Sequence, residues 1–136
     1  MTTRETIEAY FDGLESGRGW QELLSEGMEF TSFASPVRSI AGREAFLEAT
    51  KRFYSMIDSV QLRELIVADD RGCALTRYEL RAPDGRAFGS DVAEIFSVRG
   101  GRIVSFGIYF DTAPYPPRPV QPEKRTAESE GVTRTT

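Results

Sequence analysis

Apolar residues recur at helical spacing in two stretches of the chain. The first stretch predicts a helix over residues 3–16, because its apolar residues stand at i, i+3, i+4 and i+7. They are Ile7, Tyr10, Phe11 and Leu14. Thr2 and Glu5 have the spacing of a capping box at the start of this helix, and Gly17 is a typical end. The second stretch predicts a helix over residues 43–57, with an apolar stripe formed by Phe46, Ala49, Phe53, Tyr54 and Ile57.

Alternating apolar and polar residues predict strands in the second half of the chain. The four long candidates are residues 60–68, 73–82, 87–98 and 103–111. Turn-forming residues stand between them, and Gly100 and Gly101 permit the two positive φ angles of a tight hairpin turn. We therefore expect an antiparallel meander. Before it, the pattern predicts a short helix over residues 20–24 and short strands over 28–33 and 37–40.

One carboxylate interrupts an apolar row in the last hairpin, residues 94–111. Glu94 shares a strand face with Phe96 and Val98. A carboxylate on a face that packs on the core is costly unless it has a partner or a purpose. We interpret Glu94 as a pocket carboxyl, whose pKa is raised by apolar neighbours. The alternatives are a solvent-facing residue at a bulge, or a structural carboxylate that pairs with Arg77, Arg81 or Tyr78.

Composition narrows the classes of function. The 136 residues suffice for one domain with a core, and the net charge of -4 and pI near 5.0 argue against nucleic-acid binding. No apolar run is long enough to span a membrane, and the N-terminus lacks a signal-peptide pattern. A single cysteine, Cys73, fits a reducing cytoplasm. The chain has no histidine, so it cannot build a histidine-based catalytic dyad or metal site.

The composition changes after residue 113. Five of the seven prolines lie between Pro114 and Pro122, and the residues beyond them are almost entirely polar. Segments of this kind cannot bury enough apolar surface to fold. We therefore expect one domain over residues 1–113 and a Pro-rich, disordered tail over residues 114–136.

Three stretches carry a resemblance to a known superfamily. AYFDGLESG, SPVRSIAGREAF and EIFSVRGGRIVSFGIYFD resemble segments of the nuclear transport factor 2-like superfamily, over roughly residues 3–111. This superfamily includes ketosteroid isomerases, limonene epoxide hydrolases and SnoaL-like polyketide cyclases. The resemblance implies an α+β fold in which a cone-shaped, curved antiparallel sheet wraps around N-terminal helices, a cystatin-like α+β barrel.

The resemblance also implies roles for single residues. Tyr10 and Glu94 stand where ketosteroid isomerases carry their two oxyanion donors, but Ser32 stands where those enzymes carry the catalytic aspartate. A hydroxyl with an ordinary pKa cannot remove a carbon-bound proton. Ile108 stands where the epoxide hydrolases carry a catalytic aspartate. Both of these activities are therefore disfavoured, which leaves the SnoaL-like group.

We expect a cofactor-independent and metal-free cyclase or isomerase that acts on an apolar, polyketide-like or steroid-like molecule, with Glu94 and Tyr10 as catalytic residues. The predicted substrate-binding residues are Trp20, Phe30, Ser32, Tyr54, Tyr78, Phe96, Phe106, Ile108 and Phe110. Ordinary core packing is the alternative for Trp20, Phe30, Ser32, Tyr54 and Tyr78, and the alternative for Tyr10 is a core aromatic with its hydroxyl at the rim. The alternative function is a non-catalytic ligand-binding or dimerisation domain, and we expect a homodimer formed through the outer face of the sheet.

Two further charged residues have mainly structural interpretations, although Asp111 could also place its carboxylate at the mouth of the cavity, and a third is a functional candidate. Asp111 is expected to cap the end of its strand, and Asp91 to pair with an arginine on a neighbouring strand. Arg38 is a weaker candidate for closing the mouth of the pocket over an anionic group.

Overall fold

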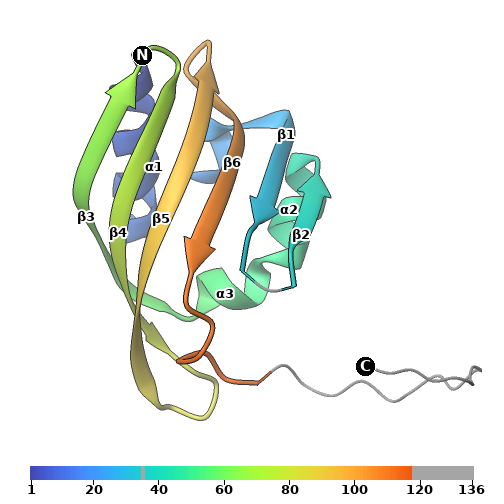
Figure 1. Ribbon diagram of the computed structural model, residues 1–136, viewed down its shortest axis with the longest axis vertical. Helices are drawn as coiled ribbons and strands as arrows, with labels where there is room; N and C mark the ends of the chain where they lie inside the picture. The colour runs from blue at the N-terminus through green and yellow to red at the C-terminus, as the bar shows by residue number, and fades with distance from the viewer. Residues whose placement is uncertain (35, 118–136) are drawn as a thin grey trace, which may run out of the picture.

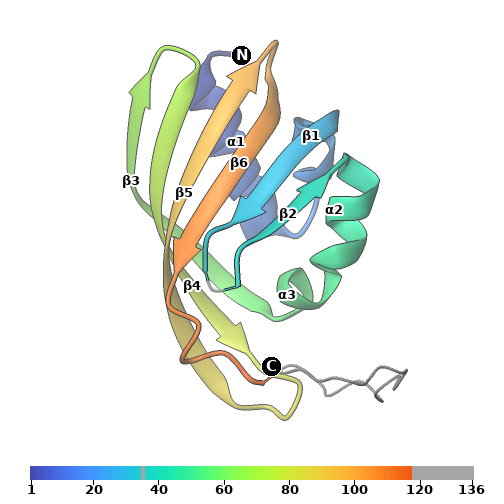
Figure 2. The same ribbon diagram turned by 45° about the vertical axis from the view of Figure 1, so that its right-hand side comes forward.

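The structure, a computed structural model, describes residues 1–34 and 36–117. A curved six-stranded sheet with the order β2-β1-β6-β5-β4-β3 wraps around α1, and α2 covers the end formed by β1 and β2 (Figures 1 and 2). The predicted α+β fold with a curved sheet is confirmed. The elements are α1 (Thr3–Ser16), η1 (Gln21–Leu23), β1 (Leu24–Ser32), β2 (Arg38–Ala41), α2 (Arg43–Ala49), α3 (Lys51–Ser55), β3 (Ile57–Ala68), β4 (Arg71–Arg81), β5 (Ala87–Arg99) and β6 (Arg102–Phe110).

Helix α1 forms as its sequence predicts. The Thr2 hydroxyl accepts the backbone N–H of Glu5, and the Glu5 carboxylate accepts the backbone N–H of Thr2, so the capping box is complete. Gly17 ends the helix at a φ of 85°, a left-handed conformation that glycine adopts without strain. The stripe of Ile7, Tyr10, Phe11 and Leu14 is buried. Over the described residues, no helix combines the length and apolar character needed to cross a membrane.

The second predicted helix is divided in two. Thr50 has φ -105° and ψ 6°, so α2 ends there and α3 begins at the next residue. The hydroxyl of Thr50 donates to the carbonyl oxygen of Phe46 at 2.7 Å, a local bond that competes with the regular helix. The prediction of one helix over residues 43–57 was therefore wrong in its continuity, and Ile57 already belongs to β3.

The antiparallel meander from β3 to β6 is confirmed. Gly100 and Gly101 both have positive φ, 59° and 74°, as the predicted hairpin turn requires. One pairing differs from the expected antiparallel sheet, because β1 runs parallel to β6. One edge of β6 pairs with β5 and its other edge pairs with β1. The pairing with β1 joins segments that are about 75 residues apart in sequence, a long-range contact that local patterns do not encode.

Helix α1 also protects the outer edge of the sheet. Strand β3 is an edge strand, and its free backbone groups would be open to pairing with another chain. The carboxylate of Glu15 accepts the N–H of Val60 at 3.0 Å, and Arg4 donates to the carbonyl oxygen of Leu65 at 3.2 Å. The charged side chains of α1 thus satisfy part of this edge.

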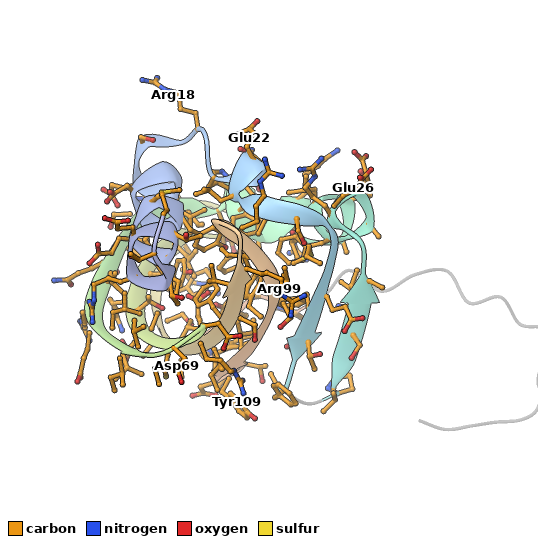
Figure 3. The ribbon with its side chains drawn as sticks, turned by 90° about the horizontal axis from the view of Figure 1, so that it is seen from above. Arg18, Glu22, Glu26, Asp69, Arg99 and Tyr109 are labelled. Carbon is orange, nitrogen blue, oxygen red and sulfur yellow. The ribbon has the colours of Figure 1, made fainter. Side chains whose placement is uncertain are left out.

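The register of the sheet places four residues in one row on its inner face. Ser32 of β1 pairs with Ile108 of β6, Ile108 with Glu94 of β5, and Glu94 with Ala74 of β4. Seen from above, side chains fill the interior between α1 and the curved sheet, whereas the labelled Arg18, Glu22 and Glu26 point outward (Figure 3). The row that holds Glu94 therefore belongs to the interior.

Candidate functional site

The centre of the candidate site is the carboxyl group of Glu94, which is 2% exposed. Its Oε2 atom accepts the hydroxyl proton of Tyr78 at 2.6 Å and lies 2.9 Å from the hydroxyl oxygen of Thr76. Thr76 and Tyr78 lie on the same face of β4, which pairs with β5. Strand parity therefore directs these two side chains and that of Glu94 inward. The sequence offered Arg77, Arg81 and Tyr78 as partners of Glu94, and the structure shows the contact with Tyr78.

Burial raises the pKa of Glu94 from 4.5 to about 7, and the hydrogen bonds from Tyr78 and Thr76 oppose this rise. The desolvation of a charged carboxylate dominates because no cation in the described part of the chain compensates it. Among the residues that the structure describes, no lysine or arginine forms an ion pair with Glu94. A carboxyl group with this pKa changes its protonation state close to neutral pH.

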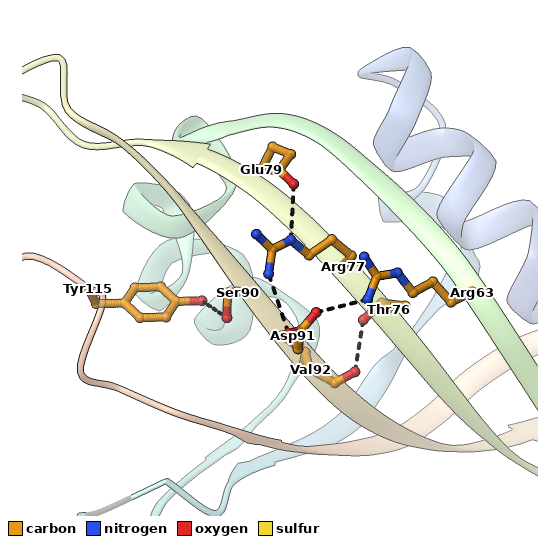
Figure 4. A network of polar contacts seen from close by, with 8 residues as sticks. All are labelled: Arg63, Thr76, Arg77, Glu79, Ser90, Asp91, Val92 and Tyr115. Carbon is orange, nitrogen blue, oxygen red and sulfur yellow. Dashed lines mark hydrogen bonds and ion pairs between the residues drawn. The ribbon is translucent and has the colours of Figure 1, made fainter.

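The charged side chains of Arg63 on β3 and Arg77 on β4 lie on the opposite, convex face of the sheet. Arg77 donates to Glu79 at 3.0 Å and to Asp91 at 3.3 Å, and Arg63 donates to Asp91 at 3.3 Å (Figure 4). Asp91 thus has the cross-strand arginine partner that its parity predicts. Arg81 pairs with Asp58. These arginines form their ion pairs on the outer face of the sheet, away from the Glu94 carboxyl group on the inner face.

A second pair of hydroxyl groups lies in the interior beside Glu94. The hydroxyl oxygens of Tyr10 and Tyr54 are 2.7 Å apart, and Tyr10 has no exposed surface. Burial raises the pKa of both tyrosines, and a negative charge on Glu94 raises it further. The charge of the Glu94 carboxyl group therefore affects the ionisation of this hydroxyl pair. Trp20 stacks on Tyr54 with 4.4 Å between ring centroids. The inward position of Tyr10 agrees with its predicted place, but its hydroxyl bonds Tyr54 rather than Glu94.

The predicted apolar lining residues lie on the inner face of the sheet. Phe106 is the centre of this group, with ring centroids 5.1 Å from Phe96 and 4.9 Å from Phe30. These three rings belong to the packed core around Tyr10. Ile108 and Phe110 lie toward the end of β6, and Ser32 lies beside Ile108 on β1. All three are only partly buried. The structure thus divides the predicted lining into a core group and a group nearer the end of the strand.

The weaker candidates of the sequence lie apart from Glu94. Arg38 is exposed on β2. Asp111 is exposed, and its carboxylate accepts the N–H of Ala113 at 3.0 Å, which is the strand-end cap expected for it.

Sequence reasoning missed Thr76, Ser90 and Tyr115. Thr76 and Ser90 share the parity of their buried neighbours, so the argument that singled out Glu94 would also have found these polar residues on an inner face. Tyr115 lies two residues beyond the expected domain end at 113, and its hydroxyl donates to Ser90 at 3.0 Å. Its ring packs against the core. Residues 118–136, which hold most of the expected tail, lie outside the described residues.

The site contains one carboxyl group and several hydroxyl groups. In the described part of the chain, no three acidic, cysteine or histidine side chains gather as a metal site would require. The arrangement suits proton transfer and hydrogen bonding to a small molecule.

Comparison with known proteins defines the class of this fold and site. The chain belongs to the SnoaL-like domain family, whose model matches residues 7–106. No match was found among the curated proteins compared. The family assignment confirms the superfamily that the sequence resembles.

Solved structures support the same fold. A nuclear transport factor 2-like protein from Burkholderia thailandensis E264 is 19% identical with a TM-score of 0.72, and the match covers 84% of this chain and 94% of that one. A proposed SnoaL-like polyketide cyclase from Jannaschia sp. CCS1 is 17% identical with a TM-score of 0.69, covering 85% and 93%. A protein with a ketosteroid isomerase-like fold from Catenulispora acidiphila DSM 44928, solved with trimethylamine, is 19% identical with a TM-score of 0.67, covering 81% and 88%. At these identities the likeness concerns the fold.

Proposed function

We propose that this SnoaL-like protein binds a small, largely apolar carbonyl compound and uses Glu94 to move a proton to or from it, without a cofactor. The observation that carries this proposal is the burial of Glu94 among hydroxyl groups and apolar side chains, with a pKa of about 7. A general acid or base works best when its pKa lies near the working pH. The polyketide-like or steroid-like character of the substrate is part of the proposal.

The hydroxyl groups around Glu94 support both of its protonation states. The single proton of the Thr76 hydroxyl faces two acceptors, Glu94 Oε2 at 2.9 Å and the carbonyl oxygen of Val92 at 3.1 Å. A protonated Glu94 can donate to the Thr76 oxygen, which leaves the threonine proton for Val92. An ionised Glu94 instead accepts from Thr76 and Tyr78. A small rotation of one hydroxyl therefore accompanies the gain or loss of the proton.

The proposed step is a proton transfer at carbon. The ionised carboxylate takes a proton from the carbon next to a carbonyl group, and the electrons of the broken C–H bond form an enolate. The same carboxyl then returns the proton to this or another position of the molecule. The hydroxyl pair of Tyr10 and Tyr54 is the proposed donor to the enolate oxygen.

Deuterium exchange into 2-tetralone, a flat apolar ketone, tests this chemistry. The wild-type protein should accelerate the exchange at the carbons beside the carbonyl group, as followed by NMR in D2O, and the rate should rise with pH through about 7 because the base must be ionised. Glu94→Gln should lower the protein-dependent rate about 100-fold or more. Glu64→Gln, which changes an exposed glutamate of β3, is the matched control and should leave the rate unchanged. Equal rates for Glu94→Gln and wild type would refute the role of Glu94.

A non-catalytic binding domain is the second candidate. It is favoured by the single carboxyl group of the site, since Glu94 is the one carboxylic acid that is buried among the described residues. A binder would take up 2-tetralone, as seen in the fluorescence of Trp20, without accelerating its exchange. Binding without acceleration in the wild type would therefore favour this candidate over the enzyme.

A second copy of the chain is the proposed occupant of the convex face of the sheet. Leu75, Ile66 and Tyr109 are exposed apolar residues on this face, and Arg63 and Asp91 lie among them with opposite charges. A two-fold interface brings each patch against itself, so a face with both signs of charge can pair with its own copy. Light scattering after gel filtration should give the mass of a dimer for wild type and of a monomer for Leu75→Asp. A monomeric wild type at micromolar concentration would contradict the proposed dimer.

A further inference from the structure

Tyr115 packs over one end of the inner face of the sheet. It belongs to the irregular segment of residues 111–117, which follows β6 and lies between α3 and the β4–β5 hairpin (Figures 1 and 2). Its ring centroid is 5.1 Å from Phe88, 5.2 Å from Phe110 and 6.4 Å from Phe53. The aromatic ring thus joins residues of β5, β6 and α3.

The hydroxyl of Tyr115 ties this segment to the strand that carries Glu94. It donates to Ser90 at 3.0 Å, as Figure 4 shows, and Ser90 is buried. Ser90 pairs in register with Tyr78, whose hydroxyl contacts Glu94. A negative charge on Glu94 contributes to raising the pKa of Tyr115, although burial is the main cause. Tyr115 is therefore close to the site, next to Tyr78.

The segment that carries Tyr115 has few backbone attachments. Strands β4, β5 and β6 are fixed by continuous ladders of hydrogen bonds. Among the described residues, the hydrogen bonds from the segment to the domain are that of the Tyr115 hydroxyl with Ser90 and a 3.3 Å bond from Arg86 to the carbonyl oxygen of Pro114, and the Tyr115 ring adds its aromatic contacts. Parts of a fold with few buried contacts and few backbone bonds open most readily.

Access to Glu94 requires such an opening. With 2% exposure, its carboxyl group cannot meet a ligand or bulk water while the surrounding side chains keep these positions. We infer that Tyr115 is a further residue of the site, which controls the access of water and ligands to Glu94 by swinging away from Ser90 together with residues 111–117. This inference rests on the proposed role of Glu94.

Hydrogen–deuterium exchange of the Glu94 carboxyl group measures this access without any ligand. At about pH 6 Glu94 is mostly protonated, whereas carboxyls with ordinary pKa values are ionised. The carbonyl stretch of a protonated carboxyl shifts in D2O, and rapid-mixing infrared spectroscopy follows that shift. The band is assigned to Glu94 if Glu94→Gln abolishes it.

The variants separate the ring of Tyr115 from its hydroxyl. Tyr115→Ala should accelerate the exchange about tenfold or more, because both the hydrogen bond and the aromatic contacts are lost. Tyr115→Phe and Ser90→Ala each remove the hydrogen bond alone and should accelerate it about threefold, with little further effect when combined. Val37→Ala is the control, because Val37 is an exposed apolar residue between β1 and β2. It should exchange at the wild-type rate.

Each outcome decides a separate question. If the Glu94 band is present and exchanges equally fast in wild type and in Tyr115→Ala, the role of Tyr115 is overturned and the proposed function stands. Exchange that is complete within the mixing time in both proteins counts as equally fast. The absence of a Glu94 band at about pH 6 would show that the pKa of Glu94 is not raised to about 7, and it would overturn the proposed function together with this inference. Faster exchange in Val37→Ala to the same extent as in Tyr115→Ala would show a general loosening of the fold and would also overturn the inference.

Discussion

At the scale of single residues, the chemistry of this protein depends on how one carboxyl group is buried. Glu94 is flanked on its own strand by Val92 and Phe96, both buried, and its polar contacts are hydroxyl groups rather than cations. Hydroxyl groups stabilise a carboxylate less than an arginine does, so the balance between its neutral and ionised forms stays near neutral pH. The arginines that could have shifted that balance are held on the outer face by Asp91 and Glu79.

The raised pKa of Glu94 has a consequence for stability. Since the folded pKa of about 7 lies above the ordinary 4.5, the folded state binds the proton more tightly, and this contribution to stability is present below about pH 4.5 and lost as the pH rises through 7. Relative to Glu94→Gln, the wild type should lose about 3 kcal/mol of unfolding free energy between pH 4.5 and pH 8. Urea denaturation of both proteins across this range measures the difference. A difference that does not change with pH would show that Glu94 has an ordinary pKa.

At the scale of elements, α1 is positioned by one close approach. A Cβ atom added to Gly13 would lie 2.9 Å from the backbone nitrogen and the Cβ of Trp20 and 3.0 Å from its Cα. The contact holds the chain after α1 directly against the helix, with Trp20 stacked on Tyr54. This approach therefore connects the helix that carries Tyr10 to the hydroxyl pair of the interior.

The substitution Gly13→Ala tests this contact. Alanine normally favours a helix over glycine by about 1 kcal/mol, but the overlap with backbone atoms should reverse the sign and destabilise the protein by about 1–2 kcal/mol. Denaturant unfolding measures the change, and the fluorescence of Trp20 should shift because its stacking is disturbed. Gly27→Ala is the control, since no atom lies within 4 Å of its added Cβ. A Gly13→Ala protein as stable as wild type would contradict the importance of the contact.

At the scale of the whole molecule, local patterns predicted the elements and not all of their assembly. The capping box, the α1 stripe and the Gly100–Gly101 turn depend on neighbours within a few residues, and each was predictable. The parallel pairing of β1 with β6 was not, because it depends on which edges of the sheet remain free after the meander has formed.

The candidate site was predictable to the same extent. Glu94 stood out because a charge on an apolar face is anomalous in any fold. Its contact with Tyr78 is diagonal, because Glu94 pairs in register with Ala74 and Tyr78 with Ser90, but Tyr78 was among the candidates. Tyr115 was missed because its proline-rich surroundings indicate a tail, whereas its contacts come from three elements that are distant in sequence.

The state of the Glu94 carboxyl group is the central claim, and NMR titration of the glutamate side-chain carboxyl carbons tests it most directly. The assigned Glu94 resonance, identified by its loss in Glu94→Gln, should titrate with a midpoint at about pH 7. The reference pKa of an unperturbed glutamate side chain in a model peptide is about 4.3. A Glu94 midpoint in the ordinary range would contradict the account, because burial would then not have raised its pKa and the carboxylate would be a weaker base at neutral pH.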